Sequence, residues 1–105
     1  MERHPIEDLI RTSVAAVMTI TGESLTDIGR AVGLADTLVS RRQRGQTSWR
    51  VSDIGRLADH WRIPPYSLIS GPSDAVNALD PSRVAELRDA KGLPTPSSPA
   101  MAAAT

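Results

Sequence analysis

Four arginines between residues 41 and 50 are the side chains of this sequence best suited to hold a polyanion. Arg41, Arg42 and Arg44 lie close together, Arg50 follows after a short polar stretch, and no acidic residue interrupts them. A guanidinium group can donate two hydrogen bonds to a phosphate or to the O6 and N7 atoms of guanine. Because charges in salt interact over only ~10 Å, this local cluster matters more than the net charge of zero. The pattern indicates a phosphate-facing surface.

Two short helices joined by a glycine-centred turn are predicted around this cluster. Ser24 is a suitable N-cap for the first helix, and Asp27 stands at the position that completes a capping box. Gly33 ends that helix, since glycine adopts the left-handed conformation without a Cβ penalty. The second helix is expected over residues 35–44 and ends at Gly45 for the same reason. This layout is typical of proteins that present one helix to the major groove of DNA.

Apolar residues at three- and four-residue intervals predict further helices on both sides of this pair. Pro5 suits the first turn of the preceding helix, and residues 65–69 are expected to form a short fifth helix. No segment alternates, so the predicted fold is all-α. Trp61 is expected in the core, and Trp49 is expected to cover it, with a DNA contact as the alternative. The two long stripes are Ile6, Leu9, Ile10, Val14, Val17 and Met18, and then Val51, Ile54, Leu57, Ala58 and Trp61.

The composition excludes several function classes. The chain has no Cys, and His4 and His60 are isolated, so neither thiol chemistry nor a metal site is expected. It has no paired catalytic groups and no phosphate-cradling glycine-rich loop after a strand, so we expect no enzyme and no cofactor. No apolar run approaches the ~18 residues of a membrane span, and the acidic start is unlike a signal peptide. We therefore expect a cytoplasmic protein.

The joint spacing of these features over residues 14–69 resembles the lambda-type repressor/Cro helix-turn-helix (XRE-like) family. Within that family, the loop followed by Trp49 is most similar to the small immunity repressors of temperate phages. The resemblance implies a compact five-helix DNA-binding domain. The matching residues are Ile28, Gly33, Leu34, Val39, Ser40, Arg41 and Gly45, then Leu57, Ala58, Ile63, Leu68 and Ile69. The departures are Gly29 for the usual Ala, Ala35 for the usual capping Ser or Thr, and Arg42 for a common apolar residue.

In this family the start of the second helix of the motif enters the major groove. The resemblance therefore implies that Asp36, Thr37, Ser40 and Arg41 contact base edges. For Asp36, holding Arg41 or capping the helix is the alternative, because a carboxylate repels phosphate. Phosphate contacts are implied for Ser24, Arg42, Arg44, Gln46, Thr47, Ser48 and Arg50.

The expected function is that of a sequence-specific, double-stranded DNA-binding transcriptional regulator, a phage-type repressor that occupies its operator. As a homodimer it would place two recognition helices on half-sites about 34 Å apart. A monomer on asymmetric sites is the alternative. The candidate dimer contacts are Tyr66, Leu68 and Ile69 in the fifth helix, or Val76, Leu79, Val84 and Leu87 in the tail.

Beyond residue 71 the sequence changes in character. Asp80 and Pro81 can start a helix over residues 82–91, which is shorter than the ~12–15 residues that a helix needs to be stable alone, so it must dock on something. A competing function uses this segment: an antitoxin-like or adaptor protein that binds a protein partner through residues 76–91. The expected organisation is a helix-turn-helix DNA-binding domain at 1–71, a linker with a short helix at 72–92 and a disordered tail at 93–105.

Overall fold

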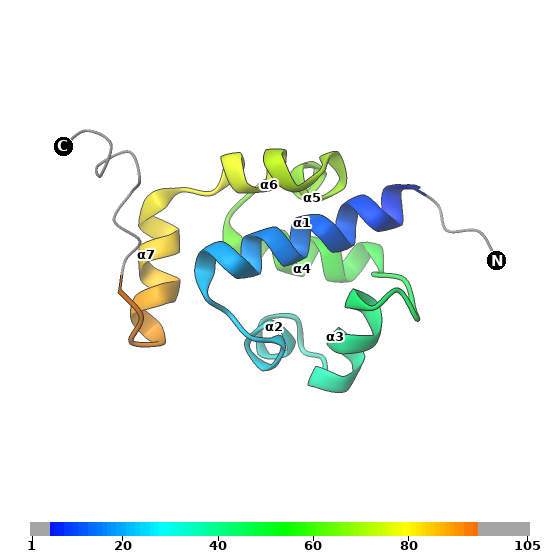
Figure 1. Ribbon diagram of the computed structural model, residues 1–105, viewed down its shortest axis with the longest axis horizontal. Coiled ribbons are helices and arrows are strands. Elements are labelled where there is room, and N and C mark those ends of the chain that lie inside the picture. The colour runs from blue at the N-terminus through cyan, green and yellow to red at the C-terminus, as the bar shows by residue number, and fades with distance from the viewer. Residues whose placement is uncertain (1–4, 95–105) are drawn as a thin grey trace.

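Seven α-helices and no strand make up the part of the chain that the computed structural model describes, residues 5–94 (Figure 1). The all-α prediction is confirmed, and each of the predicted helices is present. The predicted disordered tail lies outside the described residues from residue 95 onward. The helices are α1 (Pro5–Thr21), α2 (Leu25–Val32), α3 (Asp36–Gln43), α4 (Val51–Trp61), α5 (Pro65–Ser70), α6 (Pro72–Ala78) and α7 (Pro81–Ala90).

The longest helix, α1, is the one on which most of the others pack. In Figure 1 it crosses the middle of the molecule, and it contacts α3, α5, α6 and α7. Its residues Ile10, Val14 and Val17 are buried. The apolar stripe is not buried along its whole length, since Ile6 is 42% exposed and Leu9 is 36% exposed. The apolar period continues toward the N-terminus past the point where the neighbouring helices cover α1.

The core is aliphatic apart from two tryptophans, and the predicted burial of both rings is confirmed. Trp61 is fully enclosed at the end of α4, and Trp49 covers the core just before α4 begins. Burying such large rings contributes strongly to packing in a chain without Phe. The other buried apolar side chains of the motif and of α4 and α5 include Ile28, Val32, Val39, Ile54, Leu57, Ala58, Ile63 and Leu68.

Two helices, α6 and α7, follow α5 and pack on the same core. The helix α6 was not predicted, because its sequence has too few apolar residues at helical spacing. Ala75 is its only buried side chain. The second agrees with the helix expected over residues 82–91, and it docks with Val84 and Leu87 buried. Arg88 Nη1 also donates a 3.0 Å hydrogen bond to the carbonyl oxygen of Ile20, near the end of α1. The short helix α7 is thus stabilised by docking on the rest of the domain.

Candidate nucleic-acid interface

The helix-turn-helix predicted from the sequence consists of α2, the turn after it and α3. Ser24 is the N-cap of α2: its Oγ accepts from the backbone N–H of Asp27 at 3.2 Å, and Asp27 Oδ2 accepts from the backbone N–H of Ser24 at 2.8 Å. Gly33 has a φ of 75°, and the N–H of Leu34 donates to the carbonyl oxygen of Gly29 at 2.8 Å. These bonds satisfy the end groups of α2 and set the direction of the chain into α3. The predicted caps are confirmed.

Gly29 lies in close contact with the turn that follows α2. A Cβ atom at this position would lie 2.4 Å from the carbonyl oxygen of Leu34, which is backbone and cannot move aside cheaply. In the sequence this position stands out only as a departure from the family's usual Ala. Its real role is to let the turn approach α2 closely, and an isolated glycine inside a helical pattern is the signal that could have indicated this.

The outward face of α3 carries the four predicted base-contacting residues. Asp36, Thr37 and Arg41 are exposed, Ser40 is half-buried, and Val39 on the opposite side is fully buried in the core. Residues three and four positions apart share one face of a helix, so Thr37, Ser40 and Arg41 lie on the same surface. The structure therefore brings these side chains together on one accessible patch.

Asp36 and Ser40 also make contacts within the protein. The Oδ2 atom of Asp36 accepts a 3.5 Å hydrogen bond from Oγ1 of Thr26 in α2, so this carboxylate lies between the two helices of the motif. Ser40 Oγ accepts a 2.7 Å hydrogen bond from Nη2 of Arg44 one turn later. Ala35 occupies the N-cap position of α3. Because alanine has no polar side-chain atom, it makes no capping hydrogen bond.

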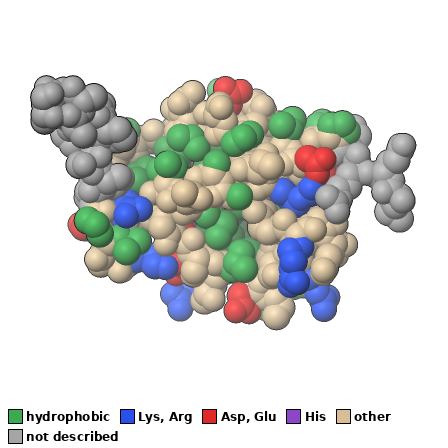
Figure 2. All heavy atoms as spheres, viewed as in Figure 1, with side chains coloured by type: hydrophobic (Ala, Val, Ile, Leu, Met, Phe, Trp, Pro, Cys, Tyr) green, Lys and Arg blue, Asp and Glu red, His purple; other side chains and the backbone are tan. Residues whose placement is uncertain are grey.

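The remaining predicted phosphate contacts beyond α3 are exposed on the loop between α3 and α4. Within this loop Gly45 has a φ of 79°, and the N–H of Gln46 donates to the carbonyl oxygen of Arg41 at 2.9 Å. In Figure 2, Lys and Arg side chains lie along the edge of the molecule formed by α2, α3 and the end of α7, with some acidic side chains among them. The exposed loop residues are Arg44, Gln46, Thr47, Ser48 and Arg50.

Arg42 differs from the other arginines of the cluster. Its side chain is only 8% exposed, and its Nε lies 3.4 Å from Oδ2 of Asp53, whose side chain is 3% exposed. Its Nη1 donates to the carbonyl oxygen of Ser48 at 3.1 Å. The guanidinium carbon lies 5.9 Å from the centre of the Trp49 ring, within the range of a cation–π contact. This guanidinium is directed into the protein, which does not favour the phosphate contact expected from the sequence.

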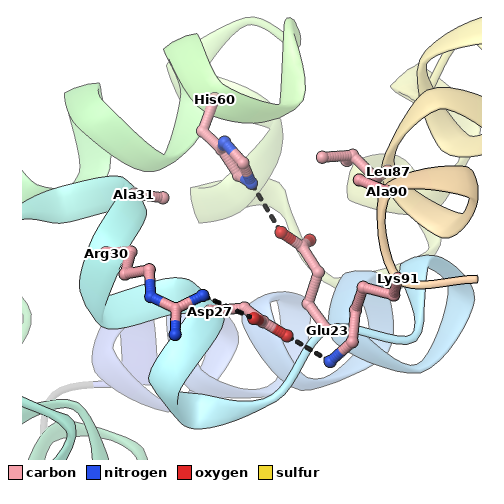
Figure 3. A pocket seen from close by; sticks show the side chains of 8 residues that line it. All are labelled: Glu23, Asp27, Arg30, Ala31, His60, Leu87, Ala90 and Lys91. Carbon is pink, nitrogen blue, oxygen red and sulfur yellow. Dashed lines mark hydrogen bonds and ion pairs between the residues drawn. The ribbon is translucent and has the colours of Figure 1, made fainter.

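A buried carboxylate that sequence reasoning missed joins α4 to the start of α2. Glu23 Oε1 accepts hydrogen bonds from Nε1 of Trp61 at 2.8 Å and Oγ1 of Thr21 at 2.7 Å. Its Oε2 lies 2.5 Å from Nε2 of His60, a contact that Figure 3 shows. Burial alone raises the pKa of Glu23, but the hydrogen bonds from His60, Trp61 and Thr21 outweigh burial and leave that pKa below its ordinary value. The carboxylate is therefore held in its charged form.

The same region contains a shallow pocket of about 310 Å³ between α2, α4 and α7 (Figure 3). Asp27 lies on its wall with its carboxylate between Lys91, which forms an ion pair with it, and Arg30, 3.8 Å away. The hydrogen bonds from Lys91 and from the backbone of Ser24 lower the pKa of Asp27 to about 2. Since Asp27 also closes the capping box, Lys91 connects the end of α7 to the first turn of the helix-turn-helix.

Comparison with known proteins identifies one family. The model of the family described as the BetR domain matches residues 6–103. Neither a curated protein nor a solved structure matches the chain. Across residues 5–94, none of the helices has both the length and the apolar character needed to cross a bilayer.

Proposed function

Since the chain belongs to the BetR domain family, a helix-turn-helix DNA-binding domain of the lambda-repressor-like kind, we propose that α3 enters the major groove of double-stranded DNA. The family is one of DNA-binding transcriptional regulators, and its domain is regulatory rather than catalytic. The proposal assigns the base contacts to Asp36, Thr37, Ser40 and Arg41. Arg41 would pair with guanine, and Thr37 would meet a thymine methyl group or a base-edge acceptor.

The observation that carries this proposal is the two-sided character of α3. Val39 is fully buried and anchors the helix in the core, whereas Thr37 and Arg41 are exposed on the surface that also carries the loop. A helix held in this way can project its outer side chains into a groove without losing its own packing.

Phosphate contacts would position α3 in the groove. We assign them to the exposed loop residues and to the start of α2, where Ser24 and backbone N–H groups lie at the positive end of the helix dipole. Such contacts set register and orientation, whereas the base contacts set sequence preference. Arg42 is left out because its guanidinium is buried. The assigned loop residues are Arg44, Gln46, Thr47, Ser48 and Arg50.

The mode of regulation that we propose is repression by occupancy of the operator, as in the small phage repressors that the sequence resembles. A homodimer would bind an inverted repeat with half-sites about 34 Å apart. The exposed apolar residues of α5, Tyr66 and Ile69, support a contact there, whereas Leu68 is fully buried within the protein. Tyr66 is 70% exposed and so offers the larger surface.

The antitoxin-like or adaptor function receives less support. It needs an apolar surface on residues 76–91 that is free for a partner protein. Val84 and Leu87 are instead buried against the domain itself. Binding of a partner through this stripe would require α7 to undock, so we do not extend the proposal to it.

Selection of binding sites from random duplex DNA, followed by affinity measurements over a salt series, tests the proposal. Enrichment of one site is expected, and an inverted repeat with one-turn spacing would support the homodimer. If the assigned residues contact phosphates, the logarithm of the affinity is expected to fall linearly with the logarithm of the salt concentration. Uniform weak binding to all sequences by the folded protein would contradict sequence-specific regulation.

A further inference from the structure

We infer that Arg42 is a positioning residue for DNA binding. Its buried guanidinium, whose charge Asp53 compensates, holds the loop between α3 and α4 in the DNA-binding conformation already in the free protein. The inference rests on the proposed phosphate contacts of that loop. It differs from the role that the arginine cluster suggests in the sequence, where Arg42 would itself touch phosphate. The two roles require opposite directions of the guanidinium, and the structure has it directed inward.

The contacts of Arg42 connect three elements. The residue lies on α3, its Nη1 donates to the carbonyl oxygen of Ser48 at 3.1 Å and lies 3.5 Å from Oγ1 of Thr47, and its Nε lies 3.4 Å from Asp53 Oδ2 on α4. The guanidinium also lies 5.9 Å from the centre of the Trp49 ring. One side chain thus contacts the loop backbone, a loop side chain and the next helix at once.

A second set of bonds holds the end of the same loop. Trp49 Nε1 donates to Oε1 of Gln43 at 2.8 Å, and Gln43 Nε2 donates to the carbonyl oxygen of Arg11 in α1 at 3.1 Å. The backbone N–H of Arg50 donates to Oδ2 of Asp53 at 3.3 Å. Asp53 Oδ2 therefore contacts both the loop backbone and the guanidinium that braces the loop.

A planar guanidinium suits this task better than an ammonium group. It can donate to a carbonyl oxygen, lie beside an aromatic ring and face a carboxylate in fixed relative directions, whereas the ammonium group of lysine is a compact point charge. A charge this deeply buried also requires a compensating charge, which Asp53 supplies. A loop already held in shape loses less conformational entropy when its side chains meet phosphate, and this raises affinity.

The test compares Arg42→Lys with Arg44→Lys, two variants that keep the charge and differ in the burial of the site. Affinity for the selected DNA site is measured below the unfolding transition of each variant, together with NMR order parameters of backbone amides 46–50 in the free protein. Arg42→Lys is expected to weaken binding about tenfold and to lower the order parameters from about 0.85 toward 0.6. Arg44→Lys is expected to weaken binding by less than about threefold, without a change in the order parameters.

Two results for Arg42→Lys would overturn the inference. One is wild-type affinity with an unchanged loop. The other is a loss of affinity with an unchanged loop, which would indicate a direct DNA contact. If Arg42→Lys does not fold, Asp53→Asn replaces it, since this change keeps an oxygen acceptor for the Arg50 N–H and removes the charge that compensates Arg42. Lower order parameters of amides 46–50 are then expected, and an unchanged loop would overturn the inference. If the wild-type protein binds no DNA, the proposed function fails, and the order parameters of the free variants still decide whether Arg42 braces the loop.

Discussion

The indole N–H of Trp61 donates a 2.8 Å hydrogen bond to Oε1 of Glu23, across 38 positions of sequence. This bond joins the last residue of α4 to the residue just before the N-cap of α2. The other oxygen of the same carboxylate contacts His60, so two consecutive residues of α4 hold one acidic side chain. The start of the helix-turn-helix is thus attached to the core through a buried charge.

Replacing Glu23 with Gln is expected to lower the free energy of unfolding at pH 7 by about 1–3 kcal/mol, because a charged acceptor of three hydrogen bonds becomes a neutral one. The pKa of Glu23 is lowered from its ordinary value of 4.5: burial raises it, but the hydrogen bonds from His60, Trp61 and Thr21 outweigh burial. A group with a lowered folded-state pKa contributes its stability above the unfolded-state pKa and loses it as the pH falls through the folded-state pKa.

Urea unfolding of the wild type and of Glu23→Gln, from pH 7 to pH 3, tests that prediction. The stability difference is expected to be full near neutral pH and to shrink progressively below about pH 4.5. A difference that stays constant over the whole range would show that the charge of Glu23 does not stabilise the fold.

Gly29→Ala is expected to destabilise the protein by about 1–3 kcal/mol, although alanine is the better helix former. The added Cβ would lie 2.4 Å from the carbonyl oxygen of Leu34, and the turn would have to shift. Gly55→Ala in α4 is the matched control, since nothing lies within 4 Å of its added Cβ. This control should stabilise the protein by up to about 1 kcal/mol. A denaturant midpoint of Gly29→Ala that is unchanged or raised, as expected for Gly55→Ala, would refute the close approach at Gly29.

Arg41→Ala and Arg44→Ala are expected to weaken DNA binding in different ways. Loss of Arg41 should cost about 1–3 kcal/mol on the selected site and relax the preference at one base pair. Loss of Arg44 should weaken specific and random DNA alike and reduce the slope of log affinity against log salt by about 0.9. Binding titrations of both variants on both DNA types, at several salt concentrations, make the distinction. Equal losses on specific and random DNA in both variants would reject this division of roles.

Ser13→Ala is expected to stabilise the protein by about 1 kcal/mol, because the buried Ser13 hydroxyl has no hydrogen-bond partner among the described residues. Ser67→Ala provides the control. The Ser67 hydroxyl is also buried, but it donates to the carbonyl oxygen of Pro64 at 2.5 Å, so its removal should destabilise by about 1 kcal/mol. Thermal unfolding of the two variants should show shifts of opposite sign, and a loss of stability in Ser13→Ala would indicate that its hydroxyl is satisfied.

The local features of the fold could be predicted from the sequence. The capping box of Ser24 and Asp27 and the left-handed turns at Gly33 and Gly45 depend on residues only a few positions apart, so the chemistry of the nearby chain determines them. The same holds for the helix-turn-helix itself, whose family the comparison supports. The placement of Val39 inward and Thr37 outward follows from the helical period.

The direction of Arg42 could not be predicted in this way. An arginine in a basic cluster is normally exposed, and its burial depends on Asp53, which α4 brings beside it. Likewise, α6 has no apolar period, and its position depends on the space beside α1 that Ala75 fills.

Except for α6, the sequence by itself determined which segments become helices and where they end, because backbone caps and helical periods act over a few residues. Only the tertiary structure decided which charged side chains are buried and which distant groups they contact. Glu23 meets His60 and Trp61 across 37 and 38 positions, and Arg88 meets the carbonyl oxygen of Ile20 across 68. Such contacts depend on how the helices pack in space, and no pattern of neighbouring residues encodes the distance between side chains that far apart in the chain.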